Sequence, residues 1–390
     1  MQKPAAIIRV WRPSHVIRLL ASGAAALAAV VASVAAVAVT PASAAPTPFL
    51  SHFNNIDVVA STVPTTGPGA GDQNPYGVAN VPFSTGNLVR GDTLVSNFNS
   101  SSNTQGTGTT IMQVAPNGQV GIFAQIDAST LPGSCPGGVG LTTALSVLGD
   151  GYVVVGSLPV NGAGTPQPGC LIVLNSDGVP VETFAGAGIN GPWDMTALQV
   201  FGPFAELFVT NVLNGTVAAG GSEVDHGTVV RLSVFDPPGR PPVFFASNVI
   251  ATGFAEELNS SALVVGPTGV ALGQNGMLYV ADTVKSRITA IPFATGRFFP
   301  VFGGGIPLST GGSLNGPLGL ATAPNGDLIT VNAGDGNAVE VSPFGMQVDT
   351  KMIDTFNSGG DLFGLAIAPG GHGLLFVNDN GAANTLDILH

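Results

Sequence analysis

The sequence predicts an all-β fold, a six-bladed β-propeller, from three observations. A phrase recurs in the second half of the chain, as GPTGVALGQNGMLYVAD at 266–282, GPLGLATAPNGDLITVNA at 316–333 and DLFGLAIAPGGHGLLFVND at 361–379. Three looser copies precede these, which brings the count to six. One apolar strand is left over before the first copy. Repetition on this scale is typical of arrays of similar supersecondary units.

Each copy of the phrase predicts a β-hairpin. A short apolar strand is followed by a turn containing Asn-Gly or Gly-Gly, and a second apolar strand then ends at or beside an Asn or Asp. Because glycine adopts positive φ without strain, such a turn reverses the chain between antiparallel strands. No useful helical periodicity follows residue 44, and frequent Gly and Pro interrupt any helix.

The spacing of the copies predicts four strands in each unit. Equivalent positions are Gly77, Thr143, Asp194, Gly269, Gly319 and Gly364, separated by 66, 51, 75, 50 and 45 residues. Four short strands with their turns need roughly 40–50 residues. We therefore assign the excess to three insertions rich in Gly and polar residues, at 99–108, 159–169 and 213–226.

The two ends of the chain are expected to complete one blade together. The sixth unit has strands only at 362–368, 374–378 and 385–389, whereas the left-over strand NIDVVAS lies at 55–61. Joining the two would close the ring and remove open sheet edges. A parallel β-helix is the competing architecture, but its repeat is far shorter.

The first 44 residues are predicted to be a signal peptide, which leaves a propeller domain at 45–390. Lys3, Arg9, Arg12 and Arg18 form a basic leader, an apolar run follows at 19–39, and Ala42-Ser43-Ala44 supplies small residues for cleavage. The expected localisation is therefore secreted. Because the apolar run is long enough to span a bilayer, an uncleaved N-terminal membrane anchor is the alternative.

Charge and cysteine content fit an exported protein. Cleavage after Ala44 leaves 7 Lys and Arg against 23 Asp and Glu, a formal charge of −16. This balance excludes nucleic acid and anionic lipid as expected partners, because both are bound mainly through Lys and Arg. An even cysteine count in an exported chain predicts a disulfide between Cys135 and Cys170, with two buried thiols as the alternative.

The pattern G-P-x-G-[VL]-A-x-x-x-x-G-x-L-x-V-x-[DN] resembles the NHL repeat. The best match is at 266–291, where Tyr279-Val280-Ala281-Asp282 precedes Ser286-Arg287-Ile288. The resemblance implies an NHL-type six-bladed propeller over nearly all of 45–390. Neighbouring members of that superfamily include gluconolactonase/regucalcin-like hydrolases, streptogramin lyases and non-catalytic binding proteins, and the fold alone does not choose among them.

The ends of the second strands carry the candidate ligand-binding residues. In a propeller, loops at one mouth of the central channel converge. The equivalent strand ends are Asn97, Ser157, Asn211, Asp282, Asn332 and Asn378. One interpretation is a ring of oxygen ligands for calcium or another divalent cation, with Asp282, Asn332 and Asn378 as the first choice. The other is that each side chain caps the turn after its strand.

The resemblance also implies a metal-binding Glu or a catalytic His, and this chain has no Glu at the position where the gluconolactonase-like family has it. The gluconolactonase-like family holds its metal with a Glu at the start of the first blade, where this chain has Asn74-Pro75-Tyr76-Gly77. Asp194 and Asp361 stand at comparable blade entries and could replace it. The lyases use a histidine, and His226 is the best general base on offer here.

Two further features could belong to a site. Trp193 and Tyr76 enter their blades at aligned positions, so they either line the channel mouth or pack between blades. The adjacent carboxylates Glu256 and Glu257 should point apart on a strand, which favours a solvated pair over a catalytic dyad.

We therefore expect an exported binding or scaffolding module with no catalytic residues and no cofactor, whose partner is a protein or a glycan. The alternative is a divalent-metal-dependent lactone or ester hydrolase in which a metal-bound water is the nucleophile. A structural protein that self-associates through its insertions is a third class.

Overall fold

The computed structural model of the 390-residue chain describes residues 47–354, 359–380 and 383–390. The predicted signal peptide at 1–44 lies outside the described residues. Residues 46–390 form one compact unit, which contains all the sheets described below. No helix in the described ranges has the length and hydropathy needed to cross a membrane.

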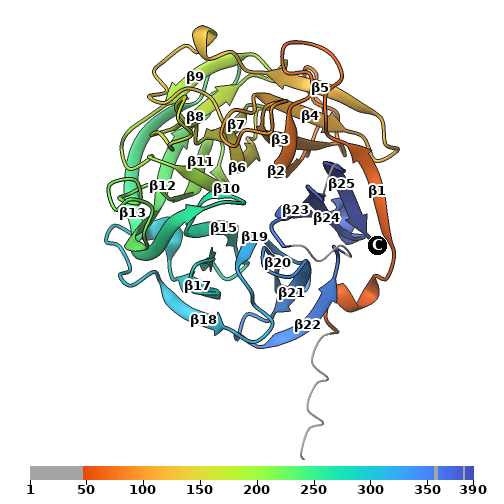
Figure 1. Ribbon diagram of the computed structural model, residues 1–390, viewed down its shortest axis with the longest axis vertical. Helices are drawn as coiled ribbons and strands as arrows, with labels where there is room; N and C mark the ends of the chain where they lie inside the picture. The colour runs from red at the N-terminus through yellow and green to blue at the C-terminus, as the bar shows by residue number, and fades with distance from the viewer. Residues whose placement is uncertain (1–46, 355–358, 381–382) are drawn as a thin grey trace, which may run out of the picture. The chain divides into compact units, whose positions relative to one another are not determined.

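Six antiparallel sheets stand in a ring, which confirms the predicted six-bladed propeller (Figure 1). The innermost strands are β2 (Gln73–Asn80), β6 (Leu141–Val147), β10 (Pro192–Phe201), β15 (Pro267–Leu272), β19 (Pro317–Thr322) and β23 (Leu362–Ile367). The second strands are β3 (Thr93–Asn99), β7 (Val153–Ser157), β11 (Phe204–Asn211), β16 (Leu278–Asp282), β20 (Leu328–Asn332) and β24 (Leu374–Asn378).

Two further strands complete each blade. The third strands are β4 (Thr110–Val114), β8 (Cys170–Leu174), β12 (Val224–Phe235), β17 (Arg287–Ile291), β21 (Asn337–Val341) and β25 (Thr385–Leu389). The outer strands are β5 (Val120–Gln125), β9 (Pro180–Phe184), β13 (Val243–Asn259), β18 (Ile306–Thr310), β22 (Gln347–Met352) and β1 (Ile56–Ser61). Buried Val, Leu and Ile from neighbouring blades pack between the sheets as the core.

The predicted closure is also confirmed. Strand β1 pairs antiparallel with β25, from Ile56 opposite Leu389 to Ser61 opposite Thr385, so the last blade is built from both ends of the described chain. The pairing continues beyond the strands, because Asn55 and His390 exchange two backbone hydrogen bonds.

The repeat glycine marks the closest approach of neighbouring blades. A methyl group built on Gly364 would overlap the carbonyl oxygen of Tyr76, and one on Gly319 would overlap that of Phe363. Each of these carbonyls belongs to the innermost strand of the next blade around the ring. Only a residue without a side chain fits at this point, which explains why the repeat has glycine there.

The third blade has five strands, whereas the spacing of the repeat predicts four. Its outer strand β13 runs from Val243 to Asn259 and continues through a hairpin into β14 (Leu263–Val265). Strand β13 is this long because β12 is also long, and the two pair from Val224 opposite Glu256 to Phe235 opposite Val243.

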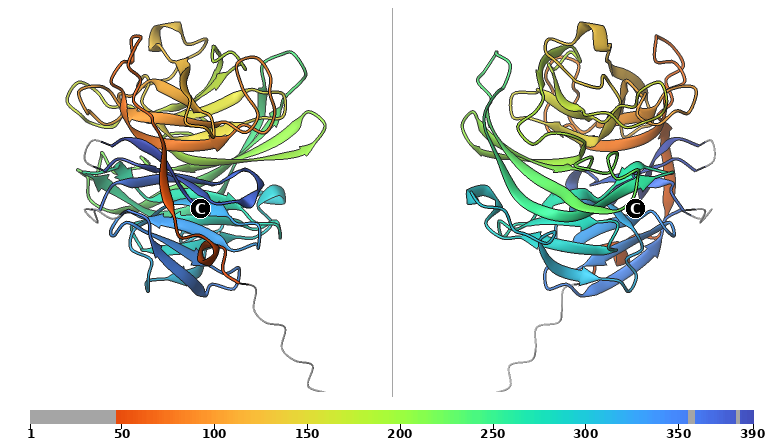
Figure 2. Two further views of the ribbon diagram at one scale, coloured as in Figure 1. Left: turned by 90° about the vertical axis from the view of Figure 1, so that its right-hand side faces the viewer. Right: turned by 60° about the vertical axis from the view of Figure 1, so that its left-hand side comes forward.

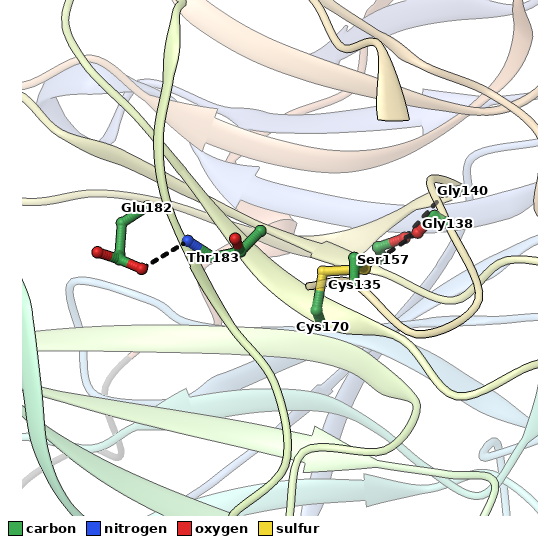
Figure 3. The surroundings of a disulfide bond; sticks show 7 residues. All are labelled: Cys135, Gly138, Gly140, Ser157, Cys170, Glu182 and Thr183. Carbon is green, nitrogen blue, oxygen red and sulfur yellow. Dashed lines mark hydrogen bonds between the residues drawn. A yellow bond between two sulfur atoms is a disulfide. The ribbon is translucent and has the colours of Figure 1, made fainter. Parts of the chain in front are cut away.

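The predicted disulfide between Cys135 and Cys170 is present, with 5.2 Å between the two Cα atoms (Figure 3). It joins the loop before β6 to the first residue of β8, within the second blade. The insertion between β7 and β8 is thereby tied at its base.

A short N-terminal segment crosses the outside of the fifth blade before it enters β1. The 3₁₀ turn η1 (Leu50–His52) packs against β22, and buried Glu340 accepts hydrogen bonds from the backbone N–H groups of Phe49 and Leu50 at 2.6 and 2.8 Å. The Lys351 ammonium donates to the carbonyl oxygens of Leu50 and Phe53. Glu340 and Lys351 thus hold the segment from both sides.

We expect Glu340→Ala to lower the free energy of unfolding by about 2–4 kcal/mol, because two buried N–H groups lose a charged acceptor. Urea denaturation followed by tryptophan fluorescence measures the effect. The control is Glu182→Ala, whose carboxylate accepts only from the N–H of Thr183 beside it (Figure 3). Equal losses in the two variants would contradict a clamping role for Glu340.

Candidate functional site

The channel has two different mouths. At the first, which we call the loop mouth, the innermost strands begin and the second strands end, as the pairs Pro267 with Asp282 and Pro317 with Asn332 show. The connections from second to third strands, including the three predicted insertions, lie at this end. At the second, the turn mouth, the short turns between first and second strands lie.

The predicted ring of Asn and Asp residues lies at the loop mouth, but its side chains are buried within their own blades. The Asn332 amide oxygen accepts from the Asn315 N–H at 3.1 Å, and its nitrogen donates to the Ser313 carbonyl at 2.7 Å. The equivalent side chains also bond to nearby groups: Asn97 donates to the Thr62 carbonyl, Asn211 accepts from the Asn190 N–H, and Asn378 accepts from the Asn380 N–H. Only the Asn378 contact is a cap of the turn that follows the strand. The contacts of Asn97, Asn211 and Asn332 instead join the end of the second strand to the segment that precedes the first strand of the blade.

Asp282 differs from the other ring residues because it forms an ion pair. Its carboxylate lies 2.7 Å from the Arg287 Nε on the neighbouring third strand, and the side chain is fully buried. Burial raises the pKa of Asp282, and the hydrogen bond and charge of Arg287 oppose that rise. The carboxylate therefore already has a cation as its partner.

Aromatic side chains fill the channel at the loop mouth. The Tyr76 ring stacks on Phe98 and on Phe363, with centroids 4.3 and 4.0 Å apart, and lies 5.9 Å from Trp193. The hairpin between β13 and β14 covers this cluster, and the carbonyl of Val264 accepts from the Trp193 indole N–H at 3.0 Å. Trp193 and Tyr76 are therefore core residues of this plug.

Above the plug, loops of four blades surround a polar cavity of about 590 Å³, which we call the loop pocket. Its polar lining consists of amide, hydroxyl and carboxylate side chains: Asn74, Asn99, Asn103, Thr104, Gln105, Ser260, Ser261, Asp361 and Asp379. Two of the three predicted insertions contribute to it. The Gln105 amide donates to the Ser260 carbonyl at 2.9 Å, which joins the first insertion to the β13–β14 hairpin.

The loop pocket contains two neighbouring carboxylates. Asp361 and Asp379 flank the start of β23 and the end of β24, and the Asp379 N–H donates to the Asp361 carbonyl at 2.8 Å. Burial, and after it the negative charge of Asp361, raise the pKa of Asp379 to about 7. One proton is therefore gained or lost at this pair near neutral pH.

Two buried amides also face the loop pocket. Asn74 and Asn99 are each only 2% exposed, and the side-chain oxygen of each has no hydrogen-bond partner among the described residues. Asn74 has a left-handed conformation, with φ of 59°, and lies within β2 between Gln73 and Pro75, which pair with Asn99 and Asn97 at the end of β3. Both oxygens are closed off from solvent, so a ligand in the pocket meets the rest of these side chains and the more exposed polar groups around them.

The turn mouth opens into a separate cavity of about 430 Å³, lined by all six innermost strands. Asp194 is its only ionisable residue. The Asp194 carboxylate accepts from the N–H groups of Met195 and Val270, at 2.8 and 3.0 Å, and so joins the third and fourth blades. Burial raises its pKa to about 7, and these two hydrogen bonds oppose the rise. Asp194 thus lies away from the loop pocket.

The remaining candidates lie apart from both cavities. His226 is exposed and its Nδ1 lies 3.1 Å from the Asn214 carbonyl. Glu256 and Glu257 lie on opposite faces of β13, and buried Glu256 accepts from the Asn214 N–H at 2.7 Å. In the described ranges, no three His, Cys, Asp or Glu side chains are grouped so that they could hold a metal ion.

No protein-family model and no curated protein matches the chain, but solved structures do. A gluconolactonase from Xanthomonas campestris is 15% identical with a TM-score of 0.50, over 86% of this chain and 88% of that one. The PQQ-bound aldose sugar dehydrogenase from Streptomyces coelicolor is 17% identical with a TM-score of 0.52, over 86% and 97%. A streptogramin B lyase is 12% identical with a TM-score of 0.50, over 86% and 97%.

These similarities define the class of protein. The chain is a six-bladed β-propeller whose structural neighbours are of the gluconolactonase and streptogramin B lyase type, as the resemblance implied. At identities this low, the likeness establishes the fold, and the site must be argued from its own residues.

Sequence reasoning missed most of the loop pocket. Asp379 directly follows Asn378 in the last copy of the repeat, and Asn99 is the first residue of the first insertion. Neither fell on the aligned ring position, so neither was singled out. The β13–β14 hairpin had no signal in the repeat, because it belongs to one blade only.

Proposed function

We propose that this chain is an exported binding module whose loop pocket takes a small polyhydroxylated ligand, such as the terminal sugars of a glycan. The polar lining of the loop pocket, made of amide, hydroxyl and carboxylate side chains from four blades, is the observation that carries the proposal. Hydroxyl groups of a sugar would donate to the carboxylates of Asp361 and Asp379 and exchange hydrogen bonds with the amides and hydroxyls around them. Export rests on the basic, apolar leader and on the disulfide, which is typical of oxidising compartments.

The shape of the site supports a small ligand. Its volume lies within the roughly 300–1,000 Å³ that small-molecule pockets occupy. The plug of Tyr76, Phe98, Trp193 and Phe363 forms the floor, so a ligand would stay at the surface and not enter the channel. Its walls come from insertions, and loops on a rigid scaffold commonly carry binding residues.

A divalent-metal-dependent lactone or ester hydrolase is the second candidate, and the Asp361–Asp379 pair favours it. A calcium ion beside the two carboxylates would relieve their repulsion, and carboxylate and amide oxygens are its preferred ligands. Asp282, Asn332 and Asn378 remain the predicted ligands of the alternative cation site on the ring. There, a metal would have to compete with the turn and ion-pair contacts already made.

We expect Asp379→Asn to weaken sugar binding at least tenfold, because a hydrogen bond to a charged acceptor contributes about 1.5–3 kcal/mol. An array of immobilised oligosaccharides identifies the bound sugar, and titration calorimetry then compares the variants. Asp177→Asn, on an exposed turn of the second blade, is the matched control. Absence of binding to every sugar on the array would overturn the proposal.

Calcium titration of the same proteins separates the two candidates. Saturable binding that Asp379→Asn abolishes, that weakens below about pH 7 and that accompanies turnover of lactones or esters would establish the second candidate. Its pH dependence follows because protonation of Asp379 competes with the metal. Loss of calcium binding on Asp282→Ala instead would place the cation on the ring.

A further inference from the structure

Phenylalanine side chains are concentrated on the surface of the fourth and fifth blades. Five of them are between 73% and 88% exposed: Phe293, Phe298, Phe299, Phe302 and Phe344. Together with the exposed Ile306 and Met346 they form what we call the Phe patch. Four of the five lie between β17 and β18, on a segment that projects beyond the sheets near η3 (Ala294–Gly296; Figure 2, cyan).

The segment that carries these four phenylalanines is firmly attached. Arg231, only 4% exposed on the third blade, donates to the carbonyls of Ala294, at 3.1 Å, and Thr295, and its guanidinium lies 5.8 Å from the centre of the Phe298 ring. Further along, Val301 forms backbone hydrogen bonds of 2.9 Å with Ile250 and Thr252 on β13. The rings are thus presented on a fixed platform between two blades.

The fifth blade extends the same surface. The turn between β21 and β22 contains Phe344 and Met346, and it is closed by the Ser342 N–H donating to the Met346 carbonyl at 2.8 Å. Gly345 in this turn packs against Leu308 on β18, the outer strand of the fourth blade, which begins with exposed Ile306. Phe344 therefore lies on a turn beside the outer strand of the fourth blade.

The area of the Phe patch matches what a stable dimer requires. An aromatic side chain can bury 150–250 Å², so five rings exposed by about three quarters or more offer roughly 600–900 Å². A standard interface buries about 800 Å² on each partner, whereas the largest apolar patch on a typical monomer is about 300–600 Å². The patch is thus as large as one complete half of an interface.

The composition of the patch favours protein over lipid. Phe and Met are enriched at protein interfaces, and the patch lacks the Trp and Tyr that are typical of membrane–water boundaries. The nearby cations Arg231 and Arg297 already donate to backbone carbonyls of this segment, and the chain has a formal net charge of −12. Anionic headgroups would find little positive charge there.

We propose that the Phe patch is the contact between two copies of this chain in a symmetric dimer. The same patch on both partners makes a self-complementary apolar interface, and its seven defining residues include no carboxylate that would face its own like charge. Such a dimer leaves the loop pocket of each copy at the other end of its channel. This inference does not depend on the proposed function.

The test is the mass of residues 46–390, the compact unit, measured by sedimentation equilibrium from 1 to 100 µM at 0.15 M salt. We expect the wild type to be a dimer that dissociates on dilution. We expect the double variant Phe299→Asp/Phe344→Asp to be a monomer at every concentration, because its dimer dissociation constant rises at least 100-fold. Val58→Asp is the control, because Val58 is 64% exposed on β1, outside the patch. Circular dichroism and thermal unfolding check that all three proteins are folded.

Three outcomes would overturn the proposal: a wild-type monomer at 100 µM, a double variant that dimerises like the wild type, or a control that dissociates as the double variant does. Flotation with vesicles of neutral and anionic phospholipid is a second arm. Binding of monomeric wild-type protein to these vesicles, lost in the double variant, would assign the Phe patch to a membrane.

Discussion

Replacing Gly364 with alanine is expected to lower the free energy of unfolding by roughly 3 kcal/mol or more. The added methyl group would overlap the carbonyl oxygen of Tyr76 on the neighbouring innermost strand. That atom is backbone, so it cannot move away as the end of a flexible side chain could. Relief requires the first and last blades to separate where they meet. Denaturation in urea, with a fit for both the midpoint and the slope, measures the loss.

Gly121→Ala is the matched control for this prediction. Gly121 also lies within a strand, β5, but a methyl group there would have no heavy atom within 4 Å. Its substitution should be neutral or slightly stabilising, because alanine restricts the unfolded chain more than glycine does. A Gly364→Ala protein as stable as Gly121→Ala would contradict the close approach of the two blades.

The protein is expected to be more stable in mild acid than at neutral pH, with a melting temperature at least about 5 °C higher at pH 5 than at pH 8. Burial raises the pKa of Asp194, Glu256 and Asp379 to about 7, and that of Asp236 and Asp327 to about 6. In the unfolded chain these carboxyl groups titrate near pH 4. Between pH 4 and pH 7, therefore, the folded state binds more protons than the unfolded state does.

The sign of the effect follows from this difference. Stability changes with pH in proportion to the protons bound by the unfolded state minus those bound by the folded state, which is negative here, so stability falls as the pH rises from 4 to 7. Calorimetric scans at half-unit steps test this. Asp379→Asn should flatten the decline and Asp177→Asn should not. A melting temperature that rises steadily from pH 4 to pH 7 would contradict the prediction.

Blade number and closure could be predicted from the sequence because both depend on repetition. Every copy of the repeat must turn the chain with Gly and bury the same apolar positions, so the pattern survives even where single residues vary. The left-over strand at 55–61 was informative for the same reason, since an incomplete last unit requires a partner. The pairing of Cys135 with Cys170 followed from there being only two cysteines.

Features that occur once could not be predicted in this way. The pair Glu256-Glu257 was predicted to be solvated, but Glu256 is buried and accepts a hydrogen bond from the N–H of Asn214, which is distant in sequence. Because this long-range contact cannot be predicted from the local sequence, the β13–β14 hairpin that covers the channel could not be predicted either. Likewise, the phenylalanines between β17 and β18 are of a residue type that is usually buried, and only the structure shows that they are exposed.

The candidate site shows the same limit. The ring of Asn and Asp residues was found because it is periodic, and its side chains form structural hydrogen bonds, to the segment before the blade at Asn332 and to the following turn at Asn378. The loop pocket draws Asn74, Asn99 and Asp379 from positions that do not correspond between blades. Such an arrangement depends on the lengths of individual loops.

The closing of the ring by β1 and β25 also sets the order of events during synthesis. About 330 residues separate the two strands, so at 5–20 residues per second β1 waits roughly 15–70 s for its partner to be made. During that time β1 has an unpaired edge, and the ring cannot close before β25 has been made. The last strand of the sixth blade therefore decides when the propeller is complete.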